Sequence, residues 1–303
     1  MGTYIIRAAR ERASKALFNW RCAGVRDLPP VKLNHGPVTV LSQVSGHDVT
    51  MYLVAVRSFC RYLTGGRVVV VDDGTLGVEG RKTIERSVSG VEFVDLDTIG
   101  TGECPRGACW ERLCEVLDRC RDGYVIQLDS DMICLREPVE ALEAVKQNRP
   151  FLLGTSNGTR IHSLAEASAL ARGIESNHVQ PAVERQLETL EEAATRRYVR
   201  ACAAFAGFAR GAARRQDAER FSAAMTEKLG KRWQEWGTEQ VTSNYLLANA
   251  EGSLVLPYPE YTSAEPGLKL DGCKMIHFLG AWRWSGGHYR RLAAGLLEEW
   301  RQG

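Results

Sequence analysis

Short apolar runs and helical apolar spacing alternate along residues 38–128. Residues 38–42 form an apolar run, and residues 49–63 carry Leu53, Val56, Cys60 and Leu63 at helical spacing. Four consecutive valines in residues 67–71 are typical of a strand buried on both faces. A helix at 80–87, a strand at 91–96, a helix at 108–120 and a strand at 124–128 follow. This alternation predicts an α/β fold with a mainly parallel, twisted sheet covered by helices.

The segments on either side of this core differ from it. In residues 1–35, a basic arm, charges such as Arg12, Lys15 and Arg21 are interleaved with apolar residues such as Leu17 and Trp20. This pattern indicates an amphipathic helix that either packs on the protein body or touches a membrane or a partner. Residues 156–200 predict a helical insertion, whose run of charges is typical of a solvated helix face. Residues 288–300 predict a closing C-terminal helix.

Composition narrows the class of protein. The chain has 303 residues, of which 44% are hydrophobic and 25% charged, and its net charge is +2. These values suit a globular enzyme and give no reason to expect a nucleic-acid partner. Cys104, Cys109, Cys114 and Cys120 are spaced five, five and six apart and form no C-x2-C knuckle of the kind common in zinc sites. No run of about 18 apolar residues and no signal-peptide pattern is present. We therefore expect a cytoplasmic protein with reduced thiols.

The sharpest chemical feature is the end of the strand predicted at 124–128, where Asp129-Ser130-Asp131 follows directly. In open α/β sheets, ligands bind just beyond the carboxyl ends of the strands. Two carboxylates there can hold Mg²⁺ or Mn²⁺, which in turn binds a diphosphate through its remaining coordination positions. The alternative is a strand-end turn with two exposed acids.

Three other segments carry candidate chemistry. Asp72-Asp73-Gly74 follows the valine strand, where the acids could bond a ribose or a base edge, or could form a tight turn that needs Gly74. His277 is either a core side chain or a ligand, and Gly280 and Arg283 follow it in a Trp- and Gly-rich loop that suits close ligand approach. Glu239 and Gln240 open a predicted helix, where complementing the helix dipole is the simplest role.

Taken together, these segments resemble the GT-A-fold nucleotide-sugar glycosyltransferases, and most of all the retaining family of glycogenin and the bacterial lipopolysaccharide galactosyltransferases. The matching segments span most of residues 38–290. The resemblance implies a GT-A-like fold in one domain, 36–303, with a nucleotide-binding half at 36–135 and an acceptor-binding half at 136–303. It also implies that residues 156–200 form much of the acceptor site.

The same resemblance implies roles for individual residues. Asp129, Asp131 and His277 would bind Mn²⁺, or else Mg²⁺. The implied donor-binding residues are Arg112, Ser130, Gly207, Gly280 and Arg283, and the implied catalytic residues are Glu239 and Gln240. Asp72 and Asp73 are further donor-binding candidates, because Asp72-Asp73-Gly74 resembles the base-reading loop of the inverting, cellulose-synthase-like family, which shares the fold. Two departures stand out: Phe205-Ala206-Gly207 lacks the asparagine of the family's Asn-x-Gly, and Val241 replaces the last acid of its Asp-Gln-Asp.

The expected activity is metal-dependent sugar transfer, with retention of configuration, from a nucleotide-diphosphate sugar, most simply a UDP-sugar. The acceptor could be a glycan, lipid, protein or small molecule. Three alternatives stay open: an inverting transferase of the same fold, a nucleotidyltransferase, and a degenerate, non-catalytic nucleotide-sugar-binding protein. The nucleotidyltransferase would need a glycine-rich G-x-G-T-R signature, which residues 38–49 lack.

Overall fold

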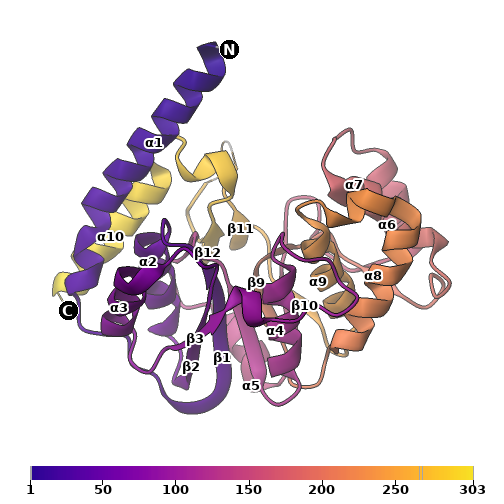
Figure 1. Ribbon diagram of the computed structural model, residues 1–303, viewed down its shortest axis with the longest axis horizontal. Coiled ribbons are helices and arrows are strands. Elements are labelled where there is room, and N and C mark those ends of the chain that lie inside the picture. The colour runs from indigo at the N-terminus through magenta and orange to yellow at the C-terminus, as the bar shows by residue number, and fades with distance from the viewer. Residues whose placement is uncertain (1, 266, 268, 303) are drawn as a thin grey trace.

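The computed structural model describes residues 2–265, 267 and 269–302, with the backbone alone for residues 2–8 and 281. A seven-stranded sheet of order β10-β6-β9-β4-β1-β2-β3 runs through the molecule (Figure 1). Its strands are β1 (Asn34–Val44), β2 (Gly65–Asp72), β3 (Glu92–Asp95), β4 (Tyr124–Leu128), β6 (Phe151–Leu153), β9 (Cys202–Phe208) and β10 (Leu254–Val255). The strands predicted within 38–128 are all present, each within a few residues of its expected bounds.

Most of the sheet is parallel. β1 pairs in parallel with β2 and with β4, and β2 pairs in parallel with β3, so the carboxyl ends of these four strands share one edge. β9 is antiparallel to both β4 and β6, and inserts between them. β9 consists mostly of small apolar residues, CAAFAGF, and is a strand that the sequence pattern did not predict.

Helices cover both faces of the sheet. Successive residues of a strand point to opposite faces of the sheet and pack in different apolar clusters. Val40 and Val70 belong to one cluster, and Leu41 and Val69 belong to the other. The first cluster packs under α1 (Gly2–Cys22), α2 (Val49–Cys60), α3 (Gly77–Ser87), α5 (Val139–Lys146) and α10 (His288–Gln302). The second packs under α4 (Trp110–Cys120), α6 (Leu164–Arg172), α7 (Val179–Glu184), α8 (Arg215–Leu229) and α9 (Thr238–Ala248). The predicted α/β fold with helices over a mainly parallel sheet is confirmed.

A second, three-stranded sheet positions the late histidine. β5 (Met132–Cys134) leaves the main sheet and pairs antiparallel with β12 (Met275–His277), which also pairs with β11 (Tyr261–Ser263). The register places His277 opposite Met132. The segment after Asp131 therefore lies beside a histidine that is 146 positions later in the sequence.

The N-terminal arm is a helix, as its pattern predicted, and it lies along α10 with its first turns projecting beyond the rest of the protein (Figure 1). Phe18 stacks on Tyr289 of α10, with ring centroids 4.7 Å apart. Met1 and the side chains of residues 2–8 lie outside the described part of the arm. No helix among the described residues has the length and apolar character needed to cross a bilayer.

Residues 156–200 are less regular than the predicted helical insertion. They hold α6, α7, the short 3-10 helix η3 (Leu187–Thr189) and a small antiparallel pair, β7 (His162–Ser163) with β8 (Arg197–Tyr198). Glu184, placed by its sequence pattern on a solvated face, is only 2% exposed. That part of the prediction is wrong, because Tyr198 and Arg200 from the following segment cover Glu184 and bond to its carboxylate.

Candidate functional site

The turn between β4 and β5 holds the paired aspartates. Asp129 N donates to the Ala204 carbonyl of β9 at 2.8 Å, and Met132 N donates back to the Asp129 carbonyl at 3.2 Å. The Asp131 carbonyl accepts from Phe278 N at 3.1 Å, which ties the turn to the segment after β12. The side chain of Asp129 is 26% exposed, whereas Asp131 is buried. The turn is therefore held by β9 on one side and by the segment after β12 on the other. The alternative of a turn with two exposed acids is wrong for Asp131, which is buried.

His277 completes a cluster with these acids. One ligand atom from each of Asp129, Asp131 and His277 can be chosen so that all three lie within 4.8 Å of one another. His277 Nε2 lies 3.2 Å from Asp131 Oδ1, and its Nδ1 lies 3.2 Å from Cys202 Sγ. Burial alone would lower the pKa of His277, but charge interactions with Cys202 and Asp131 raise it well above its usual range. The histidine is thus a site residue rather than an isolated core side chain.

An arginine holds each aspartate. Arg283 Nη2 donates to Asp131 Oδ2 at 2.5 Å, and Arg112 Nη1 makes a short hydrogen bond to Asp129 Oδ1. Arg112 comes from α4 and is buried, while Arg283 ends the 3-10 helix η5 (Gly280–Arg283) and is 23% exposed. A cation bound by the aspartates would compete with these arginines for the carboxylate oxygens, and the guanidinium groups could then donate to an anion such as a diphosphate.

The donor set fits a divalent metal. Two carboxylates and one imidazole suit Mn²⁺, because Mg²⁺ prefers oxygen ligands alone. The buried Nε of Arg112 has no hydrogen-bond partner within the described part of the chain. An unpaired buried polar atom is costly, so this N–H group beside the cluster supports a site built for a polar ligand.

Glu239 lies on the other side of Arg112. It is the second residue of α9 and only 3% exposed, and it accepts from Arg112 Nη2 at 3.3 Å. Burial raises the pKa of Glu239 to about 7, with the lowering effect of Arg112 partly offset by the charge of Asp129. A carboxyl group with such a pKa can gain or lose a proton near neutral pH.

The neighbouring Gln240 is directed elsewhere. Its Oε1 accepts from Ala203 N at 3.1 Å, and its Nε2 donates to Gln180 Oε1 at 3.2 Å. The amide therefore connects β9 to α7. A catalytic role for Gln240 remains a prediction.

The acidic loop after β2 lies at the same edge of the sheet. Asp72 lies opposite Val44 of β1 in the parallel pairing, and β1 lies between β2 and β4 in the sheet. Because neighbouring strands are about 5 Å apart, the loop is about 10 Å, or two strand spacings, from the aspartate turn. Asp72 accepts from Gly74 N at 2.9 Å and pairs with Arg81, while Asp73 accepts from Thr75 N at 2.9 Å. The two acids thus form the turn, and they also line an open cavity of about 710 Å³. Both of the roles left open by the sequence are compatible with this geometry.

The remaining donor-binding candidates occupy different environments. Ser130 is half-buried in the aspartate turn, and Gly280, with φ of +52°, begins η5 between His277 and Arg283. Gly207 lies inside β9, where an added Cβ would meet the Tyr124 hydroxyl at 2.3 Å. Close packing is therefore sufficient reason for glycine at 207, and its contact with a donor remains a prediction.

Sequence reasoning did not single out Gln127 or Cys202. Both lie in apolar stretches whose pattern predicts burial, and only the pairing of β4 with β9 and of β5 with β12 places them at the cluster. The sequence gives no local signal for either.

Comparison with known proteins supports this architecture. No protein-family model matches the chain, and no curated protein does. Among solved structures, an active-site mutant of LgtC covers 87% of this chain and 99% of its own, with 12% identity and a TM-score of 0.50. The galactosyltransferase LgtC in complex with donor and acceptor sugar analogs has 14% identity, the same coverage and a TM-score of 0.48. Mouse xyloside xylosyltransferase 1 has 10% identity over 81% of this chain and 97% of its own, with a TM-score of 0.47. The chain therefore has the GT-A fold.

Proposed function

We propose that this protein is a glycosyltransferase that uses a nucleotide-diphosphate sugar, with UDP as the nucleotide, and depends on Mn²⁺. One observation carries the proposal: Asp129, Asp131 and His277 converge at the carboxyl edge of a GT-A sheet, with an arginine on each aspartate. This arrangement pairs a cation site with two anion-binding side chains. A nucleotide diphosphate bridged to a metal needs both.

The chain's own residues then have distinct tasks. Arg112 and Arg283 bind diphosphate oxygens and orient the leaving group, because a guanidinium pairs with two oxygens at once. Bound Mn²⁺ would offset the negative charge that grows on the departing diphosphate. The loop of Asp72 and Asp73 lines the cavity that would receive the nucleoside, and Ser130, Gly207 and Gly280 are further donor contacts.

Stereochemistry depends on what lies under the sugar. Glu239 and Gln240 lie in the first turn of α9, where Glu239 contacts Arg112. We favour retention of configuration, as in the family that the sequence resembles. The alternative is inversion with Glu239 as general base, which its pKa of about 7 would permit. Proton NMR of the first-formed product distinguishes the two, since a product of opposite anomeric configuration to the donor would refute retention.

The direct test uses uridine diphosphate and UDP-sugars. UDP should raise the melting temperature with Mn²⁺ but not in chelator. At a ligand concentration of 100 times Kd, binding should add about 2.7 kcal/mol to the free energy of unfolding. Release of UDP from UDP-glucose, UDP-galactose or UDP-N-acetylglucosamine should require Mn²⁺. Asp131→Asn should abolish both effects, whereas Asp122→Asn, at an exposed turn, should preserve them.

The same assay distinguishes an active transferase from the non-catalytic alternative. A degenerate nucleotide-sugar-binding protein would show the Mn²⁺-dependent stabilisation by UDP without any release of UDP from the three sugars. Equal stabilisation in chelator would contradict the metal-bridged site itself.

A peripheral membrane contact is the second proposal for this chain. Exposed positions of α1 recur every three or four residues on one face, Ala9, Ala13, Ala16, Leu17 and Trp20, and Trp20 is 71% exposed. The exposed side chains of Arg10, Arg12 and Arg21 flank this face. A basic helix with an uncovered apolar face suits an anionic lipid surface. All nine thiols are unpaired, which suits a cytoplasmic leaflet.

A further inference from the structure

A cavity of about 230 Å³ opens in the acceptor half of the protein, with residues of α6 and α7 in its lining. Figure 1 shows where these two helices lie in the molecule. Its walls are chemically different. One part of the lining is apolar and comes from α6 and the segment just after it, namely Ala167, Leu170, Ala171 and Ile174. The other half is polar and includes His162, Glu184, Tyr198 and Arg200.

A buried ion pair forms the polar wall. Glu184 accepts from the Tyr198 hydroxyl at 2.9 Å and from Gln180 Nε2 at 3.0 Å, and Arg200 Nη1 makes a short hydrogen bond to its other oxygen. Burial raises the pKa of Glu184, although Arg200 and Tyr198 act in the opposite direction. The side chain of Arg200 is still 22% exposed at the cavity wall. Its remaining N–H groups can therefore donate to a ligand.

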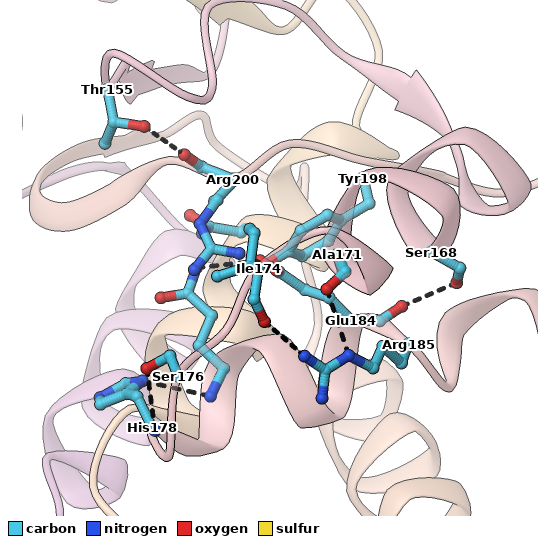
Figure 2. Close-up of polar contacts among 12 residues, drawn as sticks. Thr155, Ser168, Ala171, Ile174, Ser176, His178, Glu184, Arg185, Tyr198 and Arg200 are labelled. Atoms are coloured by element: carbon cyan, nitrogen blue, oxygen red, sulfur yellow. Dashed lines mark hydrogen bonds and ion pairs between the residues drawn. The ribbon is translucent and has the colours of Figure 1, made fainter.

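The cavity is formed before any ligand arrives. Arg185 donates to the carbonyls of Ala171 and Ile174 at 3.1 and 2.5 Å, and Ser168 Oγ donates to the Glu184 carbonyl at 2.7 Å (Figure 2). These bonds connect the end of α6 to the end of α7. Fixed walls reduce the entropy that binding would otherwise lose.

The apolar wall lacks a partner of its own. Leu170 is 56% exposed, although it faces a cavity rather than the open surface alone. An uncovered leucine opposite a buried carboxylate and a guanidinium suits a ligand with one apolar face and several hydroxyl groups. A pyranose ring has this character, with C–H groups on its face and hydroxyls at its edge. Sites for drug-sized ligands occupy about 300–1,000 Å³, so a cavity of 230 Å³ suits a single ring.

Two connections link this cavity to the metal cluster. Along the chain, Arg200 is two residues before Cys202, whose Sγ contacts His277, and two residues span at most about 7 Å. Across side chains, Gln180 bonds to Glu184 and accepts from Gln240 Nε2, and Gln240 Oε1 in turn accepts from Ala203 N, next to Cys202 in β9. The cavity and the cluster are therefore neighbours at the start of β9.

We propose that the cavity between Leu170 and the Glu184–Arg200 pair binds one sugar unit of the acceptor. Its apolar wall stacks on the C–H face of the ring, and Arg200 with Glu184 bonds the hydroxyls. This assigns a carbohydrate acceptor, and it rests on the proposed glycosyltransferase function. The donor half, with its acidic loop and arginines, is a separate region of the same edge.

Saturation-transfer NMR with methyl glucopyranoside, methyl galactopyranoside and methyl mannopyranoside tests the inference. At least one should receive saturation from the wild-type protein. Leu170→Glu should abolish the transfer, because a charge replaces the apolar wall at a position exposed enough to leave folding intact. Val139→Glu is the matched control: Val139 is 52% exposed on α5, far from α6 in Figure 1, and its replacement should change nothing. Arg200→Lys, which keeps the charge next to Glu184 but loses the planar fork, should weaken the transfer.

Absence of transfer to all three glycosides, or transfer that survives Leu170→Glu, would overturn the inference. Stabilisation by UDP with Mn²⁺ is measured on the same samples, and it should be unchanged in every variant. If that stabilisation is present while no glycoside binds, the sugar pocket is refuted and the transferase proposal stands. If the glycosides bind and UDP with Mn²⁺ has no effect, the transferase proposal fails and the sugar pocket stands.

Discussion

Glu239→Gln should stabilise this protein at alkaline pH while damaging its activity. The carboxyl group is 3% exposed, and burial raises its pKa from 4.5 to about 7. Between these two values the folded protein holds a proton that the unfolded chain has released. Stability therefore falls as pH rises through this window, and the loss is complete above the folded pKa. Glutamine resembles the protonated acid and has no charge to bury.

The magnitude follows from the same interval. Two and a half pH units at about 1.4 kcal/mol each correspond to about 3.5 kcal/mol. The variant and the wild type should therefore be similarly stable near pH 4.5, and the variant should be about 3.5 kcal/mol more stable near pH 8. Arg112 keeps a partner in the variant, because Asp129 still accepts its hydrogen bond.

Urea unfolding from pH 4.5 to 8, in chelator so that no metal contributes, measures the difference. Glu235→Gln is the control: this exposed acid lies three residues before the start of α9 and pairs with Arg232, which lowers its pKa. The free energy of unfolding of Glu235→Gln, relative to the wild type, should not increase with rising pH. Parallel stability curves for the wild type and Glu239→Gln would refute the reasoning. If Glu239 is a general base, the same variant should lose on the order of 10²–10⁴ in rate.

Three further predictions concern the metal cluster and α1. Asp131→Ala should abolish Mn²⁺ binding in calorimetry and destabilise the protein by up to about 3–5 kcal/mol, because Arg283 and His277 lose their shared partner; an unchanged melting temperature would contradict this. The affinity of the wild type for Mn²⁺ should increase with pH and should continue to increase above pH 6.5, because the metal displaces a proton that His277 holds more tightly than usual. An affinity that does not change between pH 6 and 8 would exclude His277 as a ligand. Trp20→Ala should reduce sedimentation with phosphatidylserine vesicles, while Trp236→Ala, 58% exposed on another surface, should not; equal sedimentation of both variants and the wild type would refute the membrane contact.

Local patterns were sufficient for the elements of residues 38–128. β2 contains four consecutive valines, which are buried on the two faces of the sheet in turn. In α2 and α4 the apolar residues recur about every four positions. Both patterns are visible in a short window of sequence. The same reasoning placed Asp129 and Asp131 at a strand end. It did not predict β9, whose small residues carry no clear period, and which enters the sheet between β4 and β6.

The sequence by itself determined the fold class, the carboxylate pair and the residue types that could join it. Only the tertiary structure decided which of those residues meet. His277 joins the aspartates because β5 leaves the main sheet to pair with β12, and Glu239 joins Arg112 because α9 packs against α4. Glu184 is the clearest contrast, since its charged neighbours predicted solvation and two side chains from a later segment bury it instead. Burial and pKa depend on distances in space, and a local window of sequence contains no information about the partners that a distant strand supplies.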